Sequence, residues 1–311
     1  MKSQPSQSFV TFAILGGILA VSTSSIFIRF AQQDAPSLVV AAYRLTLSSL
    51  ILAPLALTRY RPELRSLTRR EVLLGLLSGF FLALHFATWI SSLEYTSVAS
   101  SVVLVTTTPL WVALLSPLIL REVNGKTVVL GMLLALAGGG IVSISDSCTW
   151  QNGLTCPPLA SFVRGTAFFG DFLALCGAWM AAGYILIGRR LRAKMSLIPY
   201  IFVVYGMAAI VLLIILGVSG QRAFGYLPMT YLWLLLLAIV PQLLGHSTFN
   251  WALRYLPASL VSITLLGEPI GSTILAYFIL KESPTLLKIA GAVLILAGIY
   301  VASMREVNNN E

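Results

Sequence analysis

Long apolar blocks separated by short polar connections run through almost the whole 311-residue chain. Each block has about 20 residues, the length that an α-helix needs to cross a bilayer. The blocks do not alternate between apolar and polar positions, as the shorter strands of a transmembrane β-barrel do. The pattern therefore predicts an all-α integral membrane protein with ten transmembrane helices. These helices are expected near residues 9–30, 37–57, 72–93, 99–120, 127–145, 165–187, 197–217, 230–252, 258–280 and 285–304.

One long polar connection, residues 146–164, divides the chain into a first half at 9–145 and a second half at 165–304. It contains Cys148 and Cys156, which would close a short loop if the connection faces an oxidising compartment. A disulfide bridge and two free thiols both remain open. Cys176 lies inside a predicted helix and is expected to be a small apolar filler.

The composition agrees with a membrane protein, since 58% of the residues are hydrophobic and only 10% are charged, with a mean hydropathy of +0.90. The net charge of +9 does not indicate nucleic-acid binding, because the basic residues collect in alternate connections. If the N-terminus is cytoplasmic, the inside connections hold 14 Lys and Arg residues and the outside ones hold 4. By the positive-inside rule this predicts a cell-membrane protein with both termini in the cytoplasm and the central connection outside.

The two halves contain an internal repeat. An offset of 160 residues aligns the segment that begins at Leu93 with the one that begins at Leu253, without a gap. The offset pairs Tyr95 with Tyr255, Pro109 with Pro269, Glu122 with Glu282, Gly131 with Gly291 and Gly138 with Gly298. Each half has five predicted helices, an odd number, so the second copy must enter the membrane in the opposite orientation. The sequence therefore predicts an inverted repeat, the design of many secondary transporters.

The chain resembles the EamA-type permeases of the drug/metabolite transporter superfamily. The resemblance is carried by TTTPLWVALLSPLILRE with GMLLALAGGG in the first half, and by LLGEPIGSTILAYFILKE with GAVLILAGIY in the second. PSLVVAAYR at the second block and GDFLALCGAWMAAGYILIGRR at the sixth are also similar to that family. The resemblance implies ten helices, two EamA-like units and a central pathway. Many members export amino acids or other small metabolites, so the resemblance implies a class of function and no particular substrate.

Polar side chains inside apolar helices are costly and are expected to face a partner or a water-filled cavity. The candidate substrate-binding residues chosen on this ground are Arg44, His85, Trp89, Asp171, Gln242, His246, Asn250 and Glu268. Arg44 is either a structural residue that reaches the interface or an acid, or a fixed charge for a carboxylate-bearing substrate. His85 and Trp89 share a helix face, which is either packing or an aromatic wall. Asp171 is either structural, as the partner of an arginine, or part of the site.

Gln242, His246 and Asn250 recur at every fourth position and form one polar stripe on an apolar helix. The stripe either makes hydrogen bonds between helices or lines a cavity, and three consecutive turns favour the cavity. Tyr184 and Glu94 are expected at the membrane interface. The glycine pairs 131 and 138, and 291 and 298, are expected to be positions of close helix packing.

Glu268 and Pro269 lie side by side in the middle of the ninth block. A proline removes one helical hydrogen bond, so Pro269 and Pro109 are predicted hinges that leave the carbonyls of Leu265 and Val105 unpaired. Glu268 must be either protonated or paired, with Arg44 and His246 as candidate partners. It is then either a purely structural group or a group that binds a proton or a cationic part of the substrate.

These features predict a secondary transporter or exporter of small organic metabolites that works by alternating access, with proton coupling as one possibility. The expected partners are a small-molecule substrate and the lipid bilayer. A membrane-embedded enzyme acting on a lipid-linked substrate is the alternative, and a structural or sensory membrane protein is a third interpretation. No cofactor or metal is expected, because the chain has no GxxxxGK[ST] loop and its two histidines lack metal-site spacing.

Overall fold

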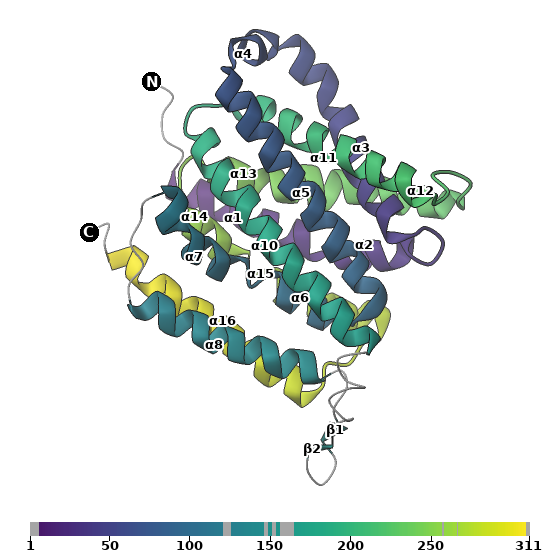
Figure 1. The fold of residues 1–311 in the computed structure, drawn as a ribbon, viewed down its shortest axis with the longest axis vertical. Helices are drawn as coiled ribbons and strands as arrows, with labels where there is room; N and C mark the ends of the chain where they lie inside the picture. Colours follow the sequence, from purple (N-terminus) through teal and green to yellow (C-terminus); the bar gives the residue numbers. More distant parts are fainter. Residues whose placement is uncertain are drawn as a thin grey trace.

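The structure is a computed structural model, and it shows a bundle of helices (Figure 1). The residues that it describes are 6–120, 126–145, 149–150, 154–155, 165–256, 258–265 and 267–308.

The first half of the chain contains eight helices within the described residues. They are α1 (Gln7–Ser22), α2 (Ser24–Ala31), α3 (Ser37–Thr58), α4 (Arg61–Ser66), α5 (Arg69–Tyr95), α6 (Val98–Val105), α7 (Thr108–Leu120) and α8 (Lys126–Ser145). Two short antiparallel strands follow, β1 (Thr149–Trp150) and β2 (Leu154–Thr155). This small hairpin is an addition to the all-α fold that the hydrophobic pattern predicts.

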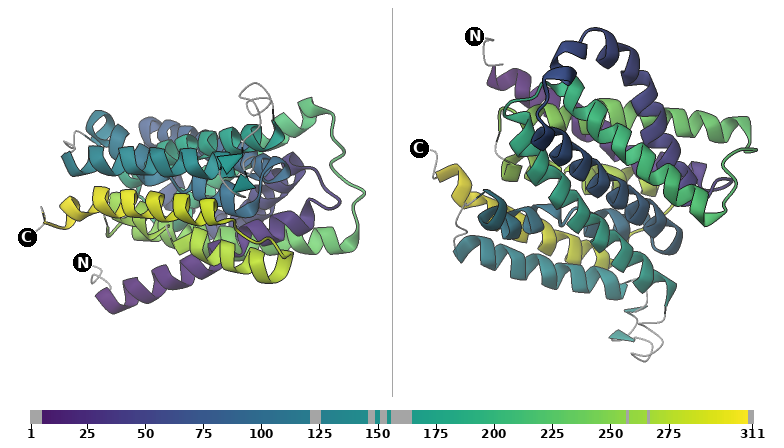
Figure 2. Two further views of the ribbon diagram at one scale, coloured as in Figure 1. Left: turned by 90° about the horizontal axis from the view of Figure 1, so that it is seen from below. Right: turned by 45° about the horizontal axis from the view of Figure 1, so that its top comes forward.

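The second half is again helical. Its elements are α10 (Thr166–Arg192), α11 (Leu197–Ser219), α12 (Pro228–Leu237), the π-helix η1 (Ala238–His246), α13 (Ser247–Ala252), α14 (Ala258–Thr264), α15 (Gly267–Leu275), the π-helix η2 (Ala276–Leu280) and α16 (Leu286–Asn308). Helix α1 begins and α16 ends on the same side of the bundle (Figure 2).

Seven helical segments of the described chain are long and apolar enough to cross a membrane. They are Ser8–Ala31, Ser37–Thr58, Arg69–Tyr95, Val98–Ile119, Thr166–Arg192, Leu197–Ser219 and Pro228–Ala252. Three shorter apolar helices, Val129–Ile141, Gly267–Leu280 and Leu286–Gly298, lie within the other three predicted blocks. Together these segments define an all-helical, multi-pass membrane protein.

Acidic side chains cap the N-termini of several of these helices. Backbone N–H groups at a helix N-terminus have no partner within the helix, and a carboxylate there satisfies them. Thr68 and Glu71 form a capping box at the start of α5. Four more acids accept a backbone N–H at or beside a first helical residue: Glu63 from Ser196, Glu94 from Ser37, Asp34 from Leu227 and Glu282 from Val98, at 2.7–2.9 Å. Glu94, expected at the interface, thus caps α3.

Helices α8 and α16 lie side by side and run antiparallel (Figure 1). Their glycines make this close approach possible. A Cβ added at Gly138 would lie 2.6 Å from the carbonyl oxygen of Gly291, and one at Gly298 would lie 2.5 Å from that of Gly131. The two matched glycine pairs therefore meet each other, because only a hydrogen atom fits between the backbones.

The helices that contain Pro109 and Pro269 are both broken, and at matched places. The chain leaves helical geometry at Thr106 between α6 and α7, and at Leu265 between α14 and α15. The carbonyls before the breaks are nevertheless satisfied, which corrects the prediction that they are free. Val105 accepts the hydroxyl of Thr108 at 2.8 Å, and Leu265 accepts the N–H of Glu268 at 2.9 Å. Pairing of this kind is what allows a break inside an apolar environment.

Two π-helical segments were not predicted from the sequence. Segment η1 contains Pro241, which lacks the N–H that an α-helix would use at that position. Such widened turns occur often at functional sites. Here η1 holds Gln242 and His246, so the predicted stripe does not follow a regular α-helical face.

Candidate functional site

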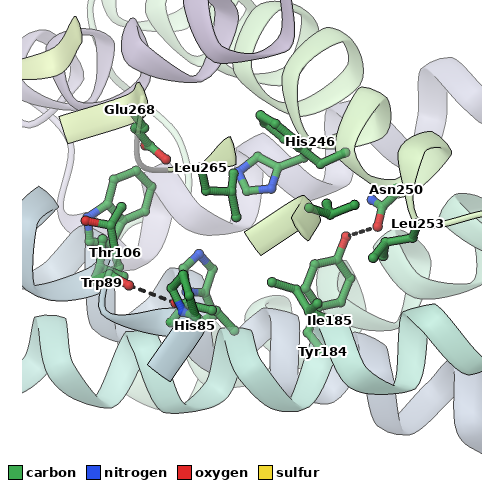
Figure 3. A pocket seen from close by; sticks show the side chains of 16 residues that line it. His85, Trp89, Thr106, Tyr184, Ile185, His246, Asn250, Leu253, Leu265 and Glu268 are labelled. Atoms are coloured by element: carbon green, nitrogen blue, oxygen red, sulfur yellow. Dashed lines mark hydrogen bonds between the residues drawn. The ribbon is translucent and has the colours of Figure 1, made fainter. Parts of the chain in front are cut away.

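A cavity lies between the two helix breaks, in the middle of the bundle (Figure 3). The space inside it that no atom fills is about 680 Å³, and this figure includes space open to solvent. Most of its wall is apolar. Its lining residues are His85, Trp89, Val105, Thr106, Thr108, Pro109, Ala181, Tyr184, Ile185, His246, Phe249, Asn250, Leu253, Val261, Leu265 and Glu268.

The structure brings five of the eight candidate residues to this cavity, namely His85, Trp89, His246, Asn250 and Glu268. The predicted hinge Pro109 also lines it, whereas Pro269 lines a separate hollow beside α16. Arg44 and Gln242 are fully buried and are not part of the wall. Asp171 lines a different cavity. The candidates thus divide into five residues of the cavity wall, the buried pair Arg44 and Gln242 behind it, and Asp171 at another cavity.

Arg44 and Gln242 form the supporting pair. The Arg44 Nε donates to Gln242 Oε1 at 2.8 Å, and its Nη1 donates to Ser24 Oγ at 2.7 Å. The guanidinium also lies over the ring of Phe86, 4.1 Å from the centroid, and 6.0 Å from that of Trp89. A buried charge is tolerated where hydrogen bonds and aromatic faces replace water. Arg44 therefore joins α2, α3 and η1 behind the cavity wall.

His85 and Trp89 form the aromatic part of the wall. Their rings are stacked, with centroids 5.8 Å apart and an angle of 16° between the planes. His85 Nδ1 lies 2.9 Å from the carbonyl oxygen of Gly177, which fixes the ring against α10. The spacing of four residues in α5 placed both rings on one face, as the sequence indicated.

Asn250 is held by two tyrosines that sequence reasoning did not place here. The Tyr184 hydroxyl donates to Asn250 Oδ1 at 2.6 Å, and Asn250 Nδ2 donates to the Tyr205 oxygen at 3.2 Å. Tyr184 was expected at the membrane interface, but it is buried and lines the cavity. The reason is that Asn250 accepts a hydrogen bond from the Tyr184 hydroxyl inside the bundle, so this hydroxyl does not have to reach the polar headgroups of the membrane.

Glu268 differs from the other acids. Among the seven acids whose side chains are described, five accept backbone N–H groups at helix starts, and Asp171 accepts the Thr96 hydroxyl at 2.9 Å. Glu268 is 7% exposed and lines the cavity, and its carboxyl group has no hydrogen bond or ion pair within the described residues. Neither Arg44 nor His246, the candidate partners, forms a hydrogen bond or an ion pair with it, although the charge of Arg44 interacts with the carboxyl group at longer range. The cavity therefore presents one free carboxyl group beside an apolar and aromatic wall (Figure 3).

The threonines at the first break are a feature that the sequence analysis missed. Thr106, Thr107 and Thr108 return their hydroxyls to the carbonyls of the preceding turn, at 2.7–3.0 Å. Thr106 and Thr108 also line the cavity opposite the second break. Three consecutive threonines before a proline are the signal that would have identified this site, because their hydroxyls can replace missing backbone donors.

Two further predictions concern the central connection and metal binding. Cys148 and Cys156 lie outside the described residues, while Cys176 is a free, half-buried thiol in α10. No group of three or more His, Cys, Asp and Glu residues suited to a metal occurs in the part of the chain that the structure describes.

The broken helices, the apolar spans and the central cavity are the features of a multi-pass membrane protein of the transporter class. The model of the EamA-like transporter family matches the chain twice, at residues 8–144 and 168–304. The chain therefore belongs to the EamA-like transporter family.

Curated relatives that match most of this chain are named as transporters. An uncharacterized transporter of Archaeoglobus fulgidus (strain ATCC 49558 / DSM 4304 / JCM 9628 / NBRC 100126 / VC-16) is 24% identical over 91% of this chain and 93% of its own length. The uncharacterized transporter YdfC of Bacillus subtilis (strain 168) is 25% identical over 84% of this chain and 79% of its own. A solved crystal structure with 18% identity covers 98% of this chain and 100% of its own, with a TM-score of 0.66. That likeness shows the fold alone.

Proposed function

We propose that the chain is a secondary transporter of small organic metabolites, such as amino acids, that works by alternating access in the cell membrane. The observation that carries the proposal is the central cavity between two matched helix breaks, with the unpaired Glu268 carboxyl group on its wall. Broken helices at the interface between repeats are where secondary transporters bind their substrates.

The proposal includes ten membrane-crossing helices arranged as two inverted five-helix repeats, 9–145 and 165–304, on either side of an external connection. The glycine contacts support it. Gly138 meets Gly291, and Gly298 meets Gly131. The repeat offset converts each of these contacts into the other, which is the relation that a two-fold axis between inverted repeats requires.

In the proposed cycle the breaks at Thr106 and Leu265 serve as hinges, because side-chain hydroxyls and a short 3₁₀-type bond can be exchanged at little cost there. The ring pair His85 and Trp89 contacts the apolar body of the substrate. Glu268 takes either a proton or a cationic group of the substrate when the cavity faces one side, and releases it on the other. Its equivalent in the first repeat is Thr108, so the two gates are chemically unequal.

The alternative, a membrane-embedded enzyme acting on a lipid-linked substrate, has less support. Within the described residues, the polar groups that line the cavity belong to a mainly apolar wall in the middle of the bundle. A lipid-linked substrate would instead place its reacting group near an interface.

The test is a flux measurement with purified protein in sealed proteoliposomes, screened against radiolabelled amino acids, related metabolites and amines in both directions, with and without a pH gradient. We expect saturable flux of at least one compound, and a Trp89→Ala variant of equal expression should reduce it. The absence of protein-dependent flux for the whole panel, in both directions and at every gradient, would contradict the proposal.

A further inference from the structure

Four arginines surround a hollow that the cavity described above does not include. Arg70 lies at the start of α5, Arg189 and Arg190 lie near the end of α10, and Arg254 follows α13. The other lining residues are Leu118, Ile119 and Ala193. We call this the arginine hollow.

The guanidinium groups of the arginine hollow are largely without partners. Arg189 Nη1 donates to the carbonyl oxygen of Leu253 at 2.7 Å. Within the described residues, the side chains of Arg70, Arg190 and Arg254 form no hydrogen bond or ion pair, and none of the residues that line the hollow is an acid. Like charges around one hollow repel each other, so this arrangement favours the binding of an anion.

The two described acids closest in sequence to Arg70 are already engaged. Glu63 Oε1 accepts the N–H of Ser196 at 2.7 Å, just before α11. Glu71 accepts both the N–H and the hydroxyl of Thr68, at 2.9 and 2.8 Å, at the start of α5. Because these carboxylates satisfy helix starts, they are not available to neutralise the four arginines.

The positive-inside bias explains the side on which these arginines lie, but not their convergence. Arg59, Arg61, Arg65 and Arg69 belong to the same predicted cytoplasmic side and do not line the hollow. Two of the rim residues are apolar and exposed, Leu118 at 80% and Ile119 at 38%. Guanidinium groups beside exposed aliphatic side chains suit a ligand that has a charged head and an apolar tail.

The arginine hollow also adjoins the central cavity. Arg189 follows Ile185 of the cavity wall by four residues on α10, so both lie on one helix face. Arg254 directly follows Leu253, which lines the cavity and accepts the Arg189 hydrogen bond. An anion held by the arginines would therefore lie about one helical turn beyond the cavity wall on α10.

We propose that the arginine hollow is a binding site for a phosphate group, carried either by an acidic phospholipid or by a free phosphate. Guanidinium groups bind phosphate oxygens through paired, charge-assisted hydrogen bonds, which suits arginine better than lysine. The site itself does not depend on the transport proposal. Only its assignment to the cytoplasmic side of the membrane follows from the proposed topology.

The experiment measures the thermal unfolding temperature of the full-length protein in a neutral detergent. Three additions are titrated separately: dioctanoyl phosphatidylglycerol, dioctanoyl phosphatidylcholine and inorganic phosphate. We expect a saturable rise of the unfolding temperature with at least one of the two anionic additions, and none with phosphatidylcholine, because a ligand stabilises the state that binds it. A response to phosphatidylglycerol alone identifies the lipid source, and a response to phosphate identifies the free one.

The variant Arg190→Gln/Arg254→Gln tests the site, and Arg59→Gln/Arg65→Gln is its matched control with the same loss of charge. All four side chains are exposed or at the surface, so neither variant removes a buried contact. The first variant should weaken apparent binding at least about tenfold, since two charge-assisted contacts are lost, and the control should respond as wild type. Equal responses of the two variants, an equal effect of phosphatidylcholine, or no response to either anion would overturn the proposal.

Discussion

At the scale of single residues, the acids show most clearly which groups are structural. Glu63, Glu71, Glu94, Asp34 and Glu282 all accept backbone N–H groups at helix starts. A carboxylate in such a position is stabilised by the hydrogen bond and by the helix dipole, so it has little freedom to change its charge in a working cycle. Glu268 has no such partner among the described residues, and this sets it apart as the acid available for function.

We predict that Glu268→Gln preserves folding and abolishes or uncouples pH-dependent transport. Glutamine has the same shape but cannot gain or lose a proton, and it cannot pair with a cationic group. Over a pH range in which the wild-type flux changes about tenfold, the flux of the variant should change less than about twofold. A tenfold change in rate corresponds to ~1.4 kcal/mol of activation free energy.

The control is Glu94→Gln, which weakens the start of α3 and leaves the cavity unchanged. That variant should lose stability by about 0.5–2 kcal/mol, as is usual for a lost cap, and should keep the wild-type pH profile. A well-expressed Glu268→Gln protein with wild-type rates and pH dependence would leave Glu268 with a structural role only.

At the scale of elements, a cluster of contacts closes the end of the bundle opposite the arginine hollow. Arg29 of α2 donates from Nη2 to the carbonyl oxygen of Thr96 at 2.8 Å and lies 3.4 Å from Glu282 Oε1. Glu282 Oε2 accepts the N–H of Val98, and Lys288 Nζ donates to Ser97 Oγ at 2.8 Å. The turn between α5 and α6 is thus tied to α2, to Glu282 in the segment between η2 and α16, and to Lys288 in α16.

We predict that this cluster holds the outer side of the cavity closed, so that Arg29→Gln and Glu282→Gln open it. The reporter is Thr106→Cys in a background without native cysteines, labelled from outside with a membrane-impermeant thiol reagent. The loss of these hydrogen bonds, worth about 1–2 kcal/mol, should increase labelling about 5- to 30-fold. Arg222→Gln, which lies outside the cluster, should have no effect, and unchanged labelling in both cluster variants would show that the gate lies elsewhere.

The hydrophobic pattern predicted most of the elements but not their internal breaks. Apolar blocks specify helices because lipid offers no hydrogen-bond partners, so the backbone N–H and C=O groups must pair within the segment. The positions of the turns at Thr106 and Leu265 depend on local bonds, such as that from the Thr108 hydroxyl to Val105, which a hydropathy pattern does not contain. The π-helix around Pro241 was missed for the same reason.

The residues that line the candidate site could be predicted from the sequence, whereas the contacts that support them could not. Period-four spacing identified the faces of α5 and α13, so His85, Trp89 and Asn250 could be named from the sequence. The partner of Arg44 is Gln242, 198 residues away, and only the packing of α3 against η1 brings the two together. No feature of the sequence shows that Arg44 pairs with Gln242 and not with Glu268.

At the scale of the whole molecule, the charge distribution and the repeat give one topology, which a set of fusions tests. Both termini are predicted to be cytoplasmic, because this orientation places 14 Lys and Arg residues in the predicted inside connections and 4 in the outside ones. The two matched glycine contacts between α8 and α16 agree with the proposed inverted repeat, because the repeat offset converts each contact into the other.

Reporters fused after Arg192 and Arg305 should therefore give a cytoplasmic signal, and reporters within 148–158 or 220–227 an external one. The decisive position is 148–158, because it connects the two halves. With five crossings before it, the chain must have changed sides, whereas an even number would return it to the cytoplasm. An external signal there supports opposite orientations for the two units, so that the breaks at Thr106 and Leu265 face each other across the cavity as opposed gates. A cytoplasmic signal from 148–158 would contradict the inverted repeat and, with it, the alternating-access mechanism built on that repeat.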